Sequence, residues 1–421
     1  MTNTQDLNVV EDFISLFDLT LNDDAKIELR RVLSTPLTSL EAISSRQMIL
    51  KEILHSELSS IYTYHKTDYA EVSYFLNIVD AQNFKNVDYL TYLFQKRTNN
   101  RLIGHYIQFA YLFFGLDKLF NEHLHISKFP KSYQEDLRFI VHYIRSFQLK
   151  KFKKQINKGK LNYSAIQYLN ETVLSKRKNG DTAKFYSILN SLEAYISIAA
   201  ATKKLGFTFP TLGKESFCIQ QMFHPLLKNP ISNDFQTDSC VILLTGANMS
   251  GKSTFLKTIG LIVYFAHLGL AVPAKEAVLP YYDFISIYIN HSDDLKNGLS
   301  HFKQEIMNMK TVLENAKQGQ RCFAVFDELY KGTNYQDALN LSTKTIQGLS
   351  QFDACKFLIS THIYELKNQI ENEDGVLAYH LHCEIEDDNP KFTYQLKEGW
   401  TNLRIGELLF QKEGLEDLLK S

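Results

Sequence analysis

The stretch TGANMSGKST at residues 245–254 constrains the fold of this chain more than any other feature. It follows the apolar run CVILLT at 240–245 and opens a segment expected to be helical over 251–268. The stretch fits the pattern G-x-x-x-x-G-K-[ST] in full, and a chance glycine turn rarely stands between a strand and a helix. Such a loop turns its backbone N–H groups inward around a phosphate. The predicted phosphate-binding loop consists of Gly246, Ala247, Asn248, Met249, Ser250, Gly251, Lys252, Ser253 and Thr254.

Within this loop, Lys252 is expected to reach the β and γ phosphates of a nucleotide, and Ser253 to ligate Mg²⁺. An acidic pair, Asp327-Glu328, ends the apolar run CFAVF at 322–326. In this position Asp327 can hold Mg²⁺ through water, and Glu328 can orient or deprotonate an attacking water. The sequence therefore predicts a Mg-ATP site suited to hydrolysis. A surface Asp-Glu pair is the alternative, but such a pair seldom caps an apolar run after a phosphate loop.

Two further residues are candidates for the same site. His362 follows the apolar run KFLIS at 356–360 and is expected to bond to the γ-phosphate. The alternative is a loop histidine satisfied by the backbone. Ser300 is expected to begin a helix, whose N-terminal N–H groups could bind a phosphate. This second helix start hints at a site completed by another subunit, although an ordinary capped helix explains the spacing as well.

The composition of the chain changes near residue 205. The first 200 residues hold only 4 of the 18 glycines and 2 of the 8 prolines, and so few helix breakers indicate long helices. After Gly206, short apolar runs alternate with helical segments, which is typical of a parallel α/β sheet. Residues 378–386 and 391–397 are expected to form a hairpin.

Residues from about 189 to 415 resemble the C-terminal half of the MutS family of DNA mismatch repair ATPases, which belong to the ABC-type ATPase group. Seven motifs occur in the family's order. They are FHP (223–225), TGANMSGKSTFLKTIG (245–260), GLAVPA (269–274), DDLKNGLSHF (293–302), FDELYKGTNYQDA (326–338), STHIYEL (360–366) and LKEGWTNLRIGELL (396–409).

The resemblance implies a fold class and two domains. We expect an all-helical N-terminal lever/core domain over residues 1–204. An α/β P-loop ATPase domain of the ABC type, like MutS domain V, is expected over residues 205–421.

The resemblance also implies roles for individual residues. Glu328 would be the general base and His362 would sense the γ-phosphate. Asn248 would shape the phosphate loop, and Gly298 with Ser300 would complete the partner's site across a homodimer. The residue that stacks on adenine is not identified, because the segment between His224 and Thr245 aligns ambiguously.

The chain departs from the family pattern near the site. Ser250 replaces a glycine before the lysine, which a turn tolerates if the φ of Ser250 is negative. Tyr330-Lys331 replaces glycine-arginine, so the charge is kept but the fork geometry of arginine is lost. Asn334 replaces a serine of the dimer-contacting loop, so these last two departures concern dimer coupling and not ATP binding.

A further departure concerns the N-terminal part. Mismatch sensors of the family carry recognition and connector domains ahead of the lever, and a stacking Phe two residues before a Glu. The string Phe120-Asn121-Glu122 has that spacing but falls in an amphipathic segment, LDKLFNEHLH. We therefore expect this chain to lack both domains and not to sense mismatches in that way.

DNA contacts, if made, must be local, because 46 Lys+Arg balance 47 Asp+Glu to a net charge of -1. Six lysines in LKKFKKQINKGK are candidate phosphate contacts, and a solvated surface is an equal alternative. They are Lys150, Lys151, Lys153, Lys154, Lys158 and Lys160.

No membrane partner is expected. The apolar stretch at 105–116 is too short to span a bilayer, and the one at 255–274 carries Lys257 and His267, so both are expected to be buried helices. A polar, acidic N-terminus and five scattered cysteines favour a cytoplasmic protein with reduced thiols.

The expected function is that of a MutS-like DNA-binding ATPase, which hydrolyses ATP to ADP and phosphate as a homodimer in DNA repair or recombination. The first alternative is an ATP-gated protein-interaction switch of the same fold with no direct nucleic-acid binding. The second, a kinase of a small molecule, is disfavoured by Asp327-Glu328 and His362.

Overall fold

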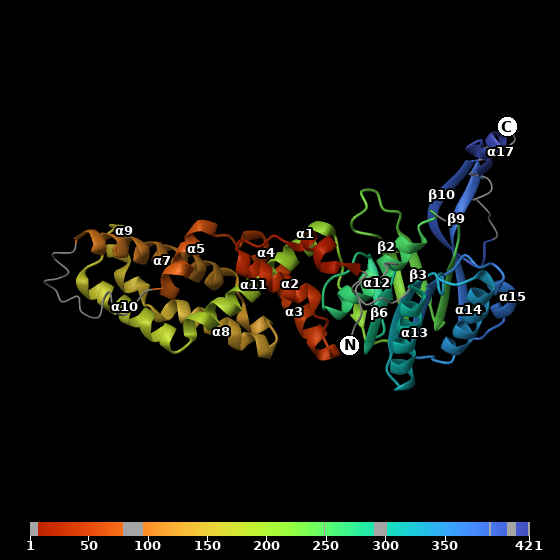
Figure 1. Ribbon diagram of the computed structural model, residues 1–421. Helices are drawn as coiled ribbons and strands as arrows, with labels where there is room; N and C mark the ends of the chain where they lie inside the picture. Colours follow the sequence, from red (N-terminus) through yellow and green to blue (C-terminus); the bar gives the residue numbers. More distant parts are fainter. Residues whose placement is uncertain are drawn as a thin grey trace. The chain divides into compact units, whose positions relative to one another are not determined.

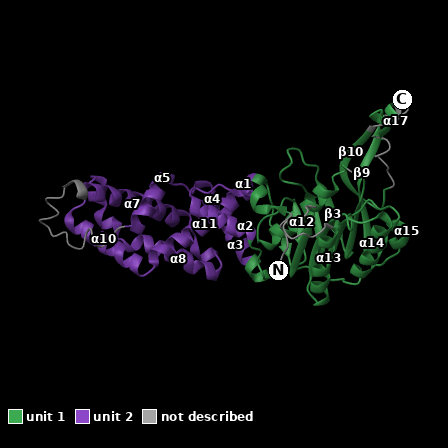
Figure 2. Cartoon of the chain, viewed as in Figure 1, with its two compact units in different colours: residues 1–13, 35–43, 205–421 green, residues 14–34, 44–204 purple. Residues whose placement is uncertain are grey.

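The computed structural model describes residues 7–78, 96–247, 249–289, 301–386, 389–401 and 410–419. Contacts among residues divide the chain into two compact units, coloured separately in Figure 2. Unit 1 comprises residues 1–13, 35–43 and 205–421, and unit 2 comprises residues 14–34 and 44–204. The predicted domains, 1–204 and 205–421, stay a prediction.

The described part of the N-terminal region is helical (Figure 1). Its elements are the π-helix η2 (Val9–Phe13), α1 (Ile14–Phe17), α2 (Asp23–Ser34), α3 (Leu40–His55), α4 (Leu58–Ile61), α5 (Lys66–Ile78), α7 (Lys96–His123), η3 (Ile126–Lys128), α8 (Lys131–Ser146), η4 (Leu149–Phe152), α9 (Lys153–Asn157), α10 (Tyr163–Lys178) and α11 (Asp181–Leu205).

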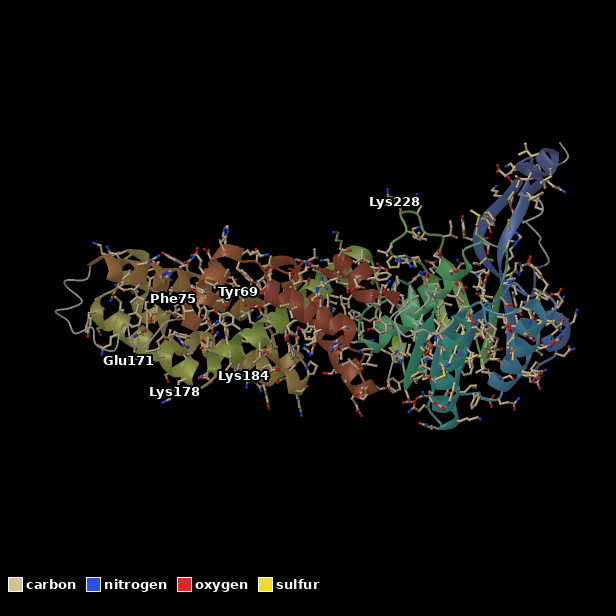
Figure 3. The ribbon with its side chains drawn as sticks, viewed as in Figure 1. Tyr69, Phe75, Glu171, Lys178, Lys184 and Lys228 are labelled. Atoms are coloured by element: carbon tan, nitrogen blue, oxygen red, sulfur yellow. The ribbon has the colours of Figure 1, made fainter. Side chains whose placement is uncertain are left out.

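Helix α11 forms the centre of unit 2, because it is buried on most of its faces. Phe185 of α11 stacks on Tyr143 of α8 with ring centroids 4.3 Å apart, and Phe113 of α7 packs on both rings. Figure 3 labels Tyr69 and Phe75, which are buried on α5, and Lys178 and Lys184, which are exposed. The helices of this unit are thus held by an aromatic core.

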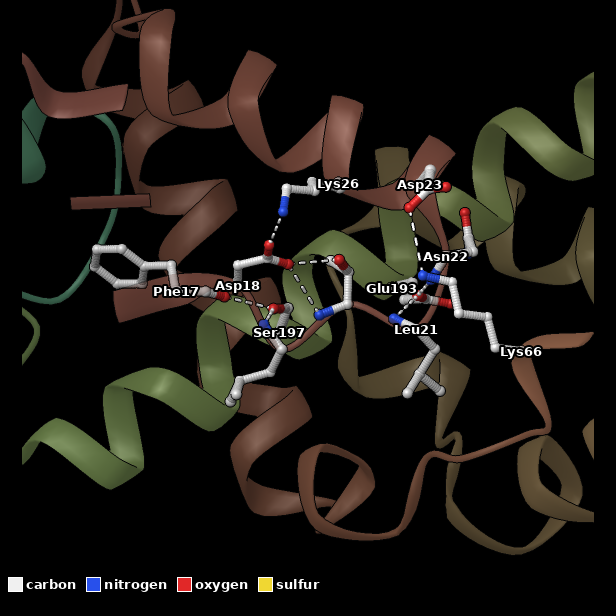
Figure 4. Close-up of polar contacts among 11 residues, drawn as sticks. Phe17, Asp18, Leu21, Asn22, Asp23, Lys26, Lys66, Glu193 and Ser197 are labelled. Carbon is white, nitrogen blue, oxygen red and sulfur yellow. Dashed lines mark hydrogen bonds and ion pairs between the residues drawn. The ribbon is translucent and has the colours of Figure 1, made fainter. Parts of the chain in front are cut away.

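A buried carboxylate fixes the segment between α1 and α2 to α11 (Figure 4). Glu193 Oε1 accepts hydrogen bonds from the backbone N–H of Leu21 at 2.6 Å and of Asn22 at 3.2 Å. Its Oε2 accepts from the hydroxyls of Tyr62 and Tyr64. Burial raises the pKa of Glu193, and these hydrogen bonds counteract part of that increase.

One turn further along α11, Ser197 continues the attachment. Its hydroxyl donates to the carbonyl of Phe17 and accepts from the N–H of Leu19 at 2.7 Å. Side chains of α11 therefore bond to backbone groups at the end of α1 and of the segment between α1 and α2.

The predicted fold class is wrong for the second part of the chain. We expected an α/β P-loop ATPase domain of the ABC type with the rhythm of a parallel sheet. Instead, a mixed α/β domain with two sheets follows the helical region. Its elements are β1 (Thr211–Leu212), β2 (Phe217–Met222), β3 (Asn233–Thr237), β4 (Val241–Thr245), α12 (Lys252–His267), β5 (Glu276–Leu279), β6 (Phe284–Tyr288), α13 (His301–Lys317), β7 (Cys322–Asp327), α14 (Tyr335–Leu349), β8 (Lys356–Ser360), α15 (Leu366–Ile370), β9 (Val376–Glu386), β10 (Asn389–Glu398) and α17 (Leu415–Leu419).

The larger sheet has the strand order β10-β9-β4-β8-β7-β6, in which only the β9–β10 pair is antiparallel. Strands β4, β7 and β8 are buried at every position, as expected for parallel strands covered on both faces. Helix α12 packs on β7 and β8, and α13 on β6 and β7. Figure 1 shows the long β9–β10 hairpin projecting beyond the rest of this sheet.

The smaller sheet has the order β1-β5-β2-β3 and contains two antiparallel pairs, β2–β3 and β2–β5. It escaped prediction because β1 and β5 are only 2 and 4 residues long, and because β2 and β3 alternate buried with exposed positions. None of these strands forms a long apolar run.

The two stretches that could suggest a membrane span both belong to helices of the folded chain. Residues 105–116 lie within α7, and residues 255–267 within α12, which is buried almost throughout. In the described ranges, every helix is too short or too polar to cross a bilayer.

Candidate active site

The glycine-rich loop joins the central strand β4 to helix α12. Two glycines make its path possible, since Gly246 has a φ of 139° and Gly251 a φ of 95°. A Cβ on Gly251 would also come within 3.1 Å of the Tyr394 ring. Ser250 is not among the residues with positive φ, so the condition for its replacing a glycine is met. Met249 has a φ of 69° and is 75% exposed at the tip of the loop.

Lys252, the first residue of α12, turns back over the loop. Its Nζ donates to the carbonyl of Gly246 at 2.7 Å and to that of Ala247 at 3.1 Å. Burial lowers the pKa of Lys252, while the nearby carboxylates of Glu328 and Asp327 oppose that shift. A buried ammonium group at the start of a helix is suited to bind an anion.

Asp327 lies at the carboxyl end of β7 and connects the loop to the neighbouring strand. Its Oδ2 accepts from the hydroxyl of Ser253 at 2.5 Å, and its Oδ1 accepts from the hydroxyl of Ser360 at the end of β8. A hydroxyl and a carboxylate are the hard oxygen donors that Mg²⁺ prefers. Ser253 and Asp327 therefore fit a magnesium ion.

Glu328 follows directly, in a left-handed conformation with a φ of 63°. Its Oε2 lies 3.0 Å from Nζ of Lys331, and its Oε1 lies 3.5 Å from Nδ1 of His362. The hydrogen bond from His362, and then that from Lys331, lower the pKa of Glu328 to about 2. Its N–H donates to the hydroxyl of Ser360 at 2.9 Å, which fixes the strained turn.

Several of these groups line a cavity of about 1200 Å³. Its charged and polar lining includes Lys252, Ser253, Glu328, Lys331 and His362. The apolar part of its wall includes Phe223, Leu227, Ile231, Leu381 and Tyr394. A cavity lined by both charged and apolar side chains has room for a ligand with a phosphate chain and a ring.

Tyr394 is a residue of this wall that the sequence did not identify. It lies in an irregular part of β10, where the pairing with β9 shifts between Phe392 and Leu396. Its φ is 55°, and its ring is next to Gly251. A bulge re-aims a side chain out of the alternation of its strand, so strand periodicity does not reveal Tyr394 as a site residue.

The other residues that the sequence singled out near the site are either outside the described residues or have the following positions. Asn248, Gly298 and Ser300 lie outside the described residues. Thr254 lines the cavity. Asn334 caps helix α14, because its side chain accepts from the N–H of Asp337 at 3.0 Å.

In the helical region, Phe120 is 2% exposed, so its ring is part of the core and does not present itself to a ligand. The six candidate lysines between 150 and 160 are all exposed. Lys150 forms an ion pair with Asp117 at 3.4 Å, which offsets part of their charge.

The fold and the site together define a mixed α/β domain in which a glycine-rich loop faces an acidic pair at one edge of a sheet. The family model for MutS domain V matches residues 242–410, which contain both features. Residues 242–410 therefore belong to the MutS domain V family.

The relatives with similar sequences include proteins named DNA mismatch repair protein MutS. The one from Persephonella marina is 31% identical over 66% of this chain and 32% of its own length. The one from Bacillus subtilis is 31% identical over 53% of this chain and 26% of its own length. The one from Bacillus velezensis is 27% identical over 73% of this chain and 38% of its own length. The chain thus spans about a third of the length of these relatives.

Proposed function

We propose that this chain binds Mg-ATP in the cavity and hydrolyses it to ADP and phosphate. The observation that carries this proposal is that Lys252, Ser253 and Glu328 line one cavity, with Asp327 hydrogen-bonded to Ser253 beside it. Membership in the MutS family supports the same cofactors.

The phosphate chain would lie along the glycine-rich loop, where backbone N–H groups and Lys252 offset its charge. Ser253 and Asp327 would hold Mg²⁺, which when bound neutralises charge on the β and γ oxygens. The apolar wall, with Ile231 and Tyr394, would receive the base.

Hydrolysis requires a water that attacks the γ-phosphorus while the bond to the ADP oxygen breaks. Glu328, which lines the cavity, would orient this water and accept its proton. Nζ of Lys331 and Nδ1 of His362, which lie 3.0 Å and 3.5 Å from its carboxylate oxygens, would hold the orientation of this side chain. His362 would in addition contact the γ-phosphate, because it lines the same cavity.

The binding step is tested by Lys252→Met, which removes the buried charge and keeps the length of the side chain. We expect ATP affinity measured by calorimetry to fall at least about tenfold, because the phosphates lose a buried cationic partner. Lys317→Met, an exposed change at the end of α13, is the matched control and should bind ATP like the wild type. Equal affinity in wild type and Lys252→Met would contradict the proposed site.

We further propose that the ATPase acts as a homodimer in DNA mismatch repair or recombination, with Gly298 and Ser300 completing the partner's site. DNA would contact the six lysines between 150 and 160. The alternative is an ATP-gated protein-interaction switch of the same fold with no direct nucleic-acid binding.

A further inference from the structure

Asn233 connects the edges of the two sheets next to the cavity. It begins β3, the edge strand of the smaller sheet, and its side chain reaches β10, the edge strand of the larger sheet. Its Nδ2 donates to the carbonyl of Tyr394 at 3.0 Å, and its Oδ1 accepts from the N–H of Leu396 at 2.7 Å. One side chain thus bonds to backbone groups on both sides of Gln395.

The bonded segment is the irregular part of β10. Between the pairs Phe392–Cys383 and Leu396–Leu381, β10 contains three residues, whereas β9 contains only one. Within this segment Thr393 is attached to β9, since its hydroxyl donates to the carbonyl of His382 at 3.0 Å. The other end of the segment is attached to β3 by Asn233.

The chemistry of an asparagine suits this task. Its side-chain amide carries a hydrogen-bond donor and an acceptor side by side, as a neighbouring peptide group would. Aspartate lacks the donor and alanine lacks both groups. Tyr394 has a φ of 55°, a strained conformation for a residue other than glycine, so its conformation depends on such external support.

We propose that Asn233 is a positioning residue for the base of the nucleotide: its amide holds the β10 bulge so that the Tyr394 ring forms one wall of the base subsite. Asn233 and Tyr394 both line the cavity, so a strand of each sheet, β3 and β10, contributes to its wall. This inference rests on the proposed binding of ATP and adds the residue that sets base recognition.

The test is a double-mutant cycle of ATP affinity with wild type, Asn233→Ala, Tyr394→Ala and the double variant. If Asn233 acts through Tyr394, Asn233→Ala weakens ATP binding about tenfold, and the double variant binds no more weakly than Tyr394→Ala. If Asn233 only stabilised the fold, Asn233→Ala would lower the melting temperature, but its effect on ATP affinity would add to that of Tyr394→Ala. Gln236→Ala, an exposed change on the same strand, is the matched control.

Asn233→Asp provides a second variant, in case Asn233→Ala does not fold. It keeps the acceptor for Leu396 but places a carboxylate oxygen against the Tyr394 carbonyl, so ATP binding should again weaken. Inorganic tripolyphosphate, used as a competitor, has no base and should bind to wild type and Asn233→Asp alike.

Three results would overturn the inference: wild-type affinity in Asn233→Ala, no effect of Tyr394→Ala, or additive effects in the double variant. Failure of the proposed function has a different signature, because the wild-type chain itself would then not bind ATP.

Discussion

Single residues decide how the α/β domain responds to pH, and His267 is the clearest case. It is buried in α12, where its Nδ1 bonds to the carbonyl of Val263 at 2.8 Å and its Nε2 accepts from the N–H of Tyr282 at 3.0 Å. The second bond requires an unprotonated Nε2. Burial lowers the pKa of His267 from 6.5 to about 4.

The folded state binds this proton more weakly than the unfolded state does. The contribution of neutral His267 to the free energy of unfolding is therefore fully present above pH 6.5 and is lost as the pH falls towards 4. The shift corresponds to about 3 kcal/mol at most. We expect His267→Gln to reduce the difference between urea midpoints measured at pH 7.5 and pH 5. His55→Gln, a change at an exposed histidine, should keep the wild-type difference. An unchanged pH dependence in His267→Gln would contradict this explanation.

The residues of the candidate site differ in how far the sequence revealed them. Lys252 and Ser253 belong to a local sequence pattern that follows one apolar run, and Asp327 and Glu328 end another apolar run. Because both runs are strands of one sheet, the sequence leads us to expect these residues to lie close together, and Ser253 does bond to Asp327. Their roles stay predictions. Tyr394 and Asn233 gave no such signal, because they meet through an irregular strand and a contact across 161 positions of sequence.

At the scale of the elements, the strands of the larger sheet have a clear local sequence signal, whereas those of the smaller sheet do not. Strands β4, β7 and β8 are continuous apolar runs that sequence alone locates. The strands of the smaller sheet are short or half exposed, and their antiparallel pairing depends on contacts that no local pattern records. The predicted fold class is wrong because it does not include this second, partly antiparallel sheet.

In the helical region, the attachment of the α1–α2 segment to α11 is expected to depend on Glu193. Glu193→Ala leaves two backbone N–H groups and two tyrosine hydroxyls without their acceptor, which should cost about 3 kcal/mol or more in unfolding free energy. Glu193→Gln keeps an acceptor and avoids burying a charge, so its loss should be smaller.

Urea unfolding followed by circular dichroism at 222 nm, the wavelength of the helical signal, measures this difference. Glu171→Ala, at an exposed position of α10, is the control (Figure 3). Stability of Glu193→Ala equal to that of the wild type would show that the carboxylate is dispensable.

At the scale of the whole molecule, the net charge of -1 leaves the lysines between 150 and 160 as the local candidate for DNA binding. Replacing all six by glutamine should weaken binding to duplex and four-way-junction DNA. The replacement should also reduce the steepness with which the logarithm of the association constant falls with the logarithm of salt concentration. The slope should decrease in magnitude by about 0.9 for each DNA phosphate that a lysine no longer neutralises. Replacement of Lys310, Lys317 and Lys367, which lie in the α/β domain, is the control.

If the six-lysine variant binds DNA with the wild-type affinity and salt dependence, the lysines are not DNA contacts. If the wild-type chain binds no DNA at all, the protein-interaction switch becomes the better account of the molecule.

The central claim, hydrolysis of Mg-ATP with Glu328 as the base, is tested most directly by one paired measurement on Glu328→Gln. ATP affinity and steady-state phosphate release are measured on the same preparation, with Glu371→Gln, an exposed change after α15, as the control. We predict that Glu328→Gln binds ATP with near wild-type affinity but loses at least about 100-fold in turnover. Phosphate release at the wild-type rate in Glu328→Gln would contradict the account.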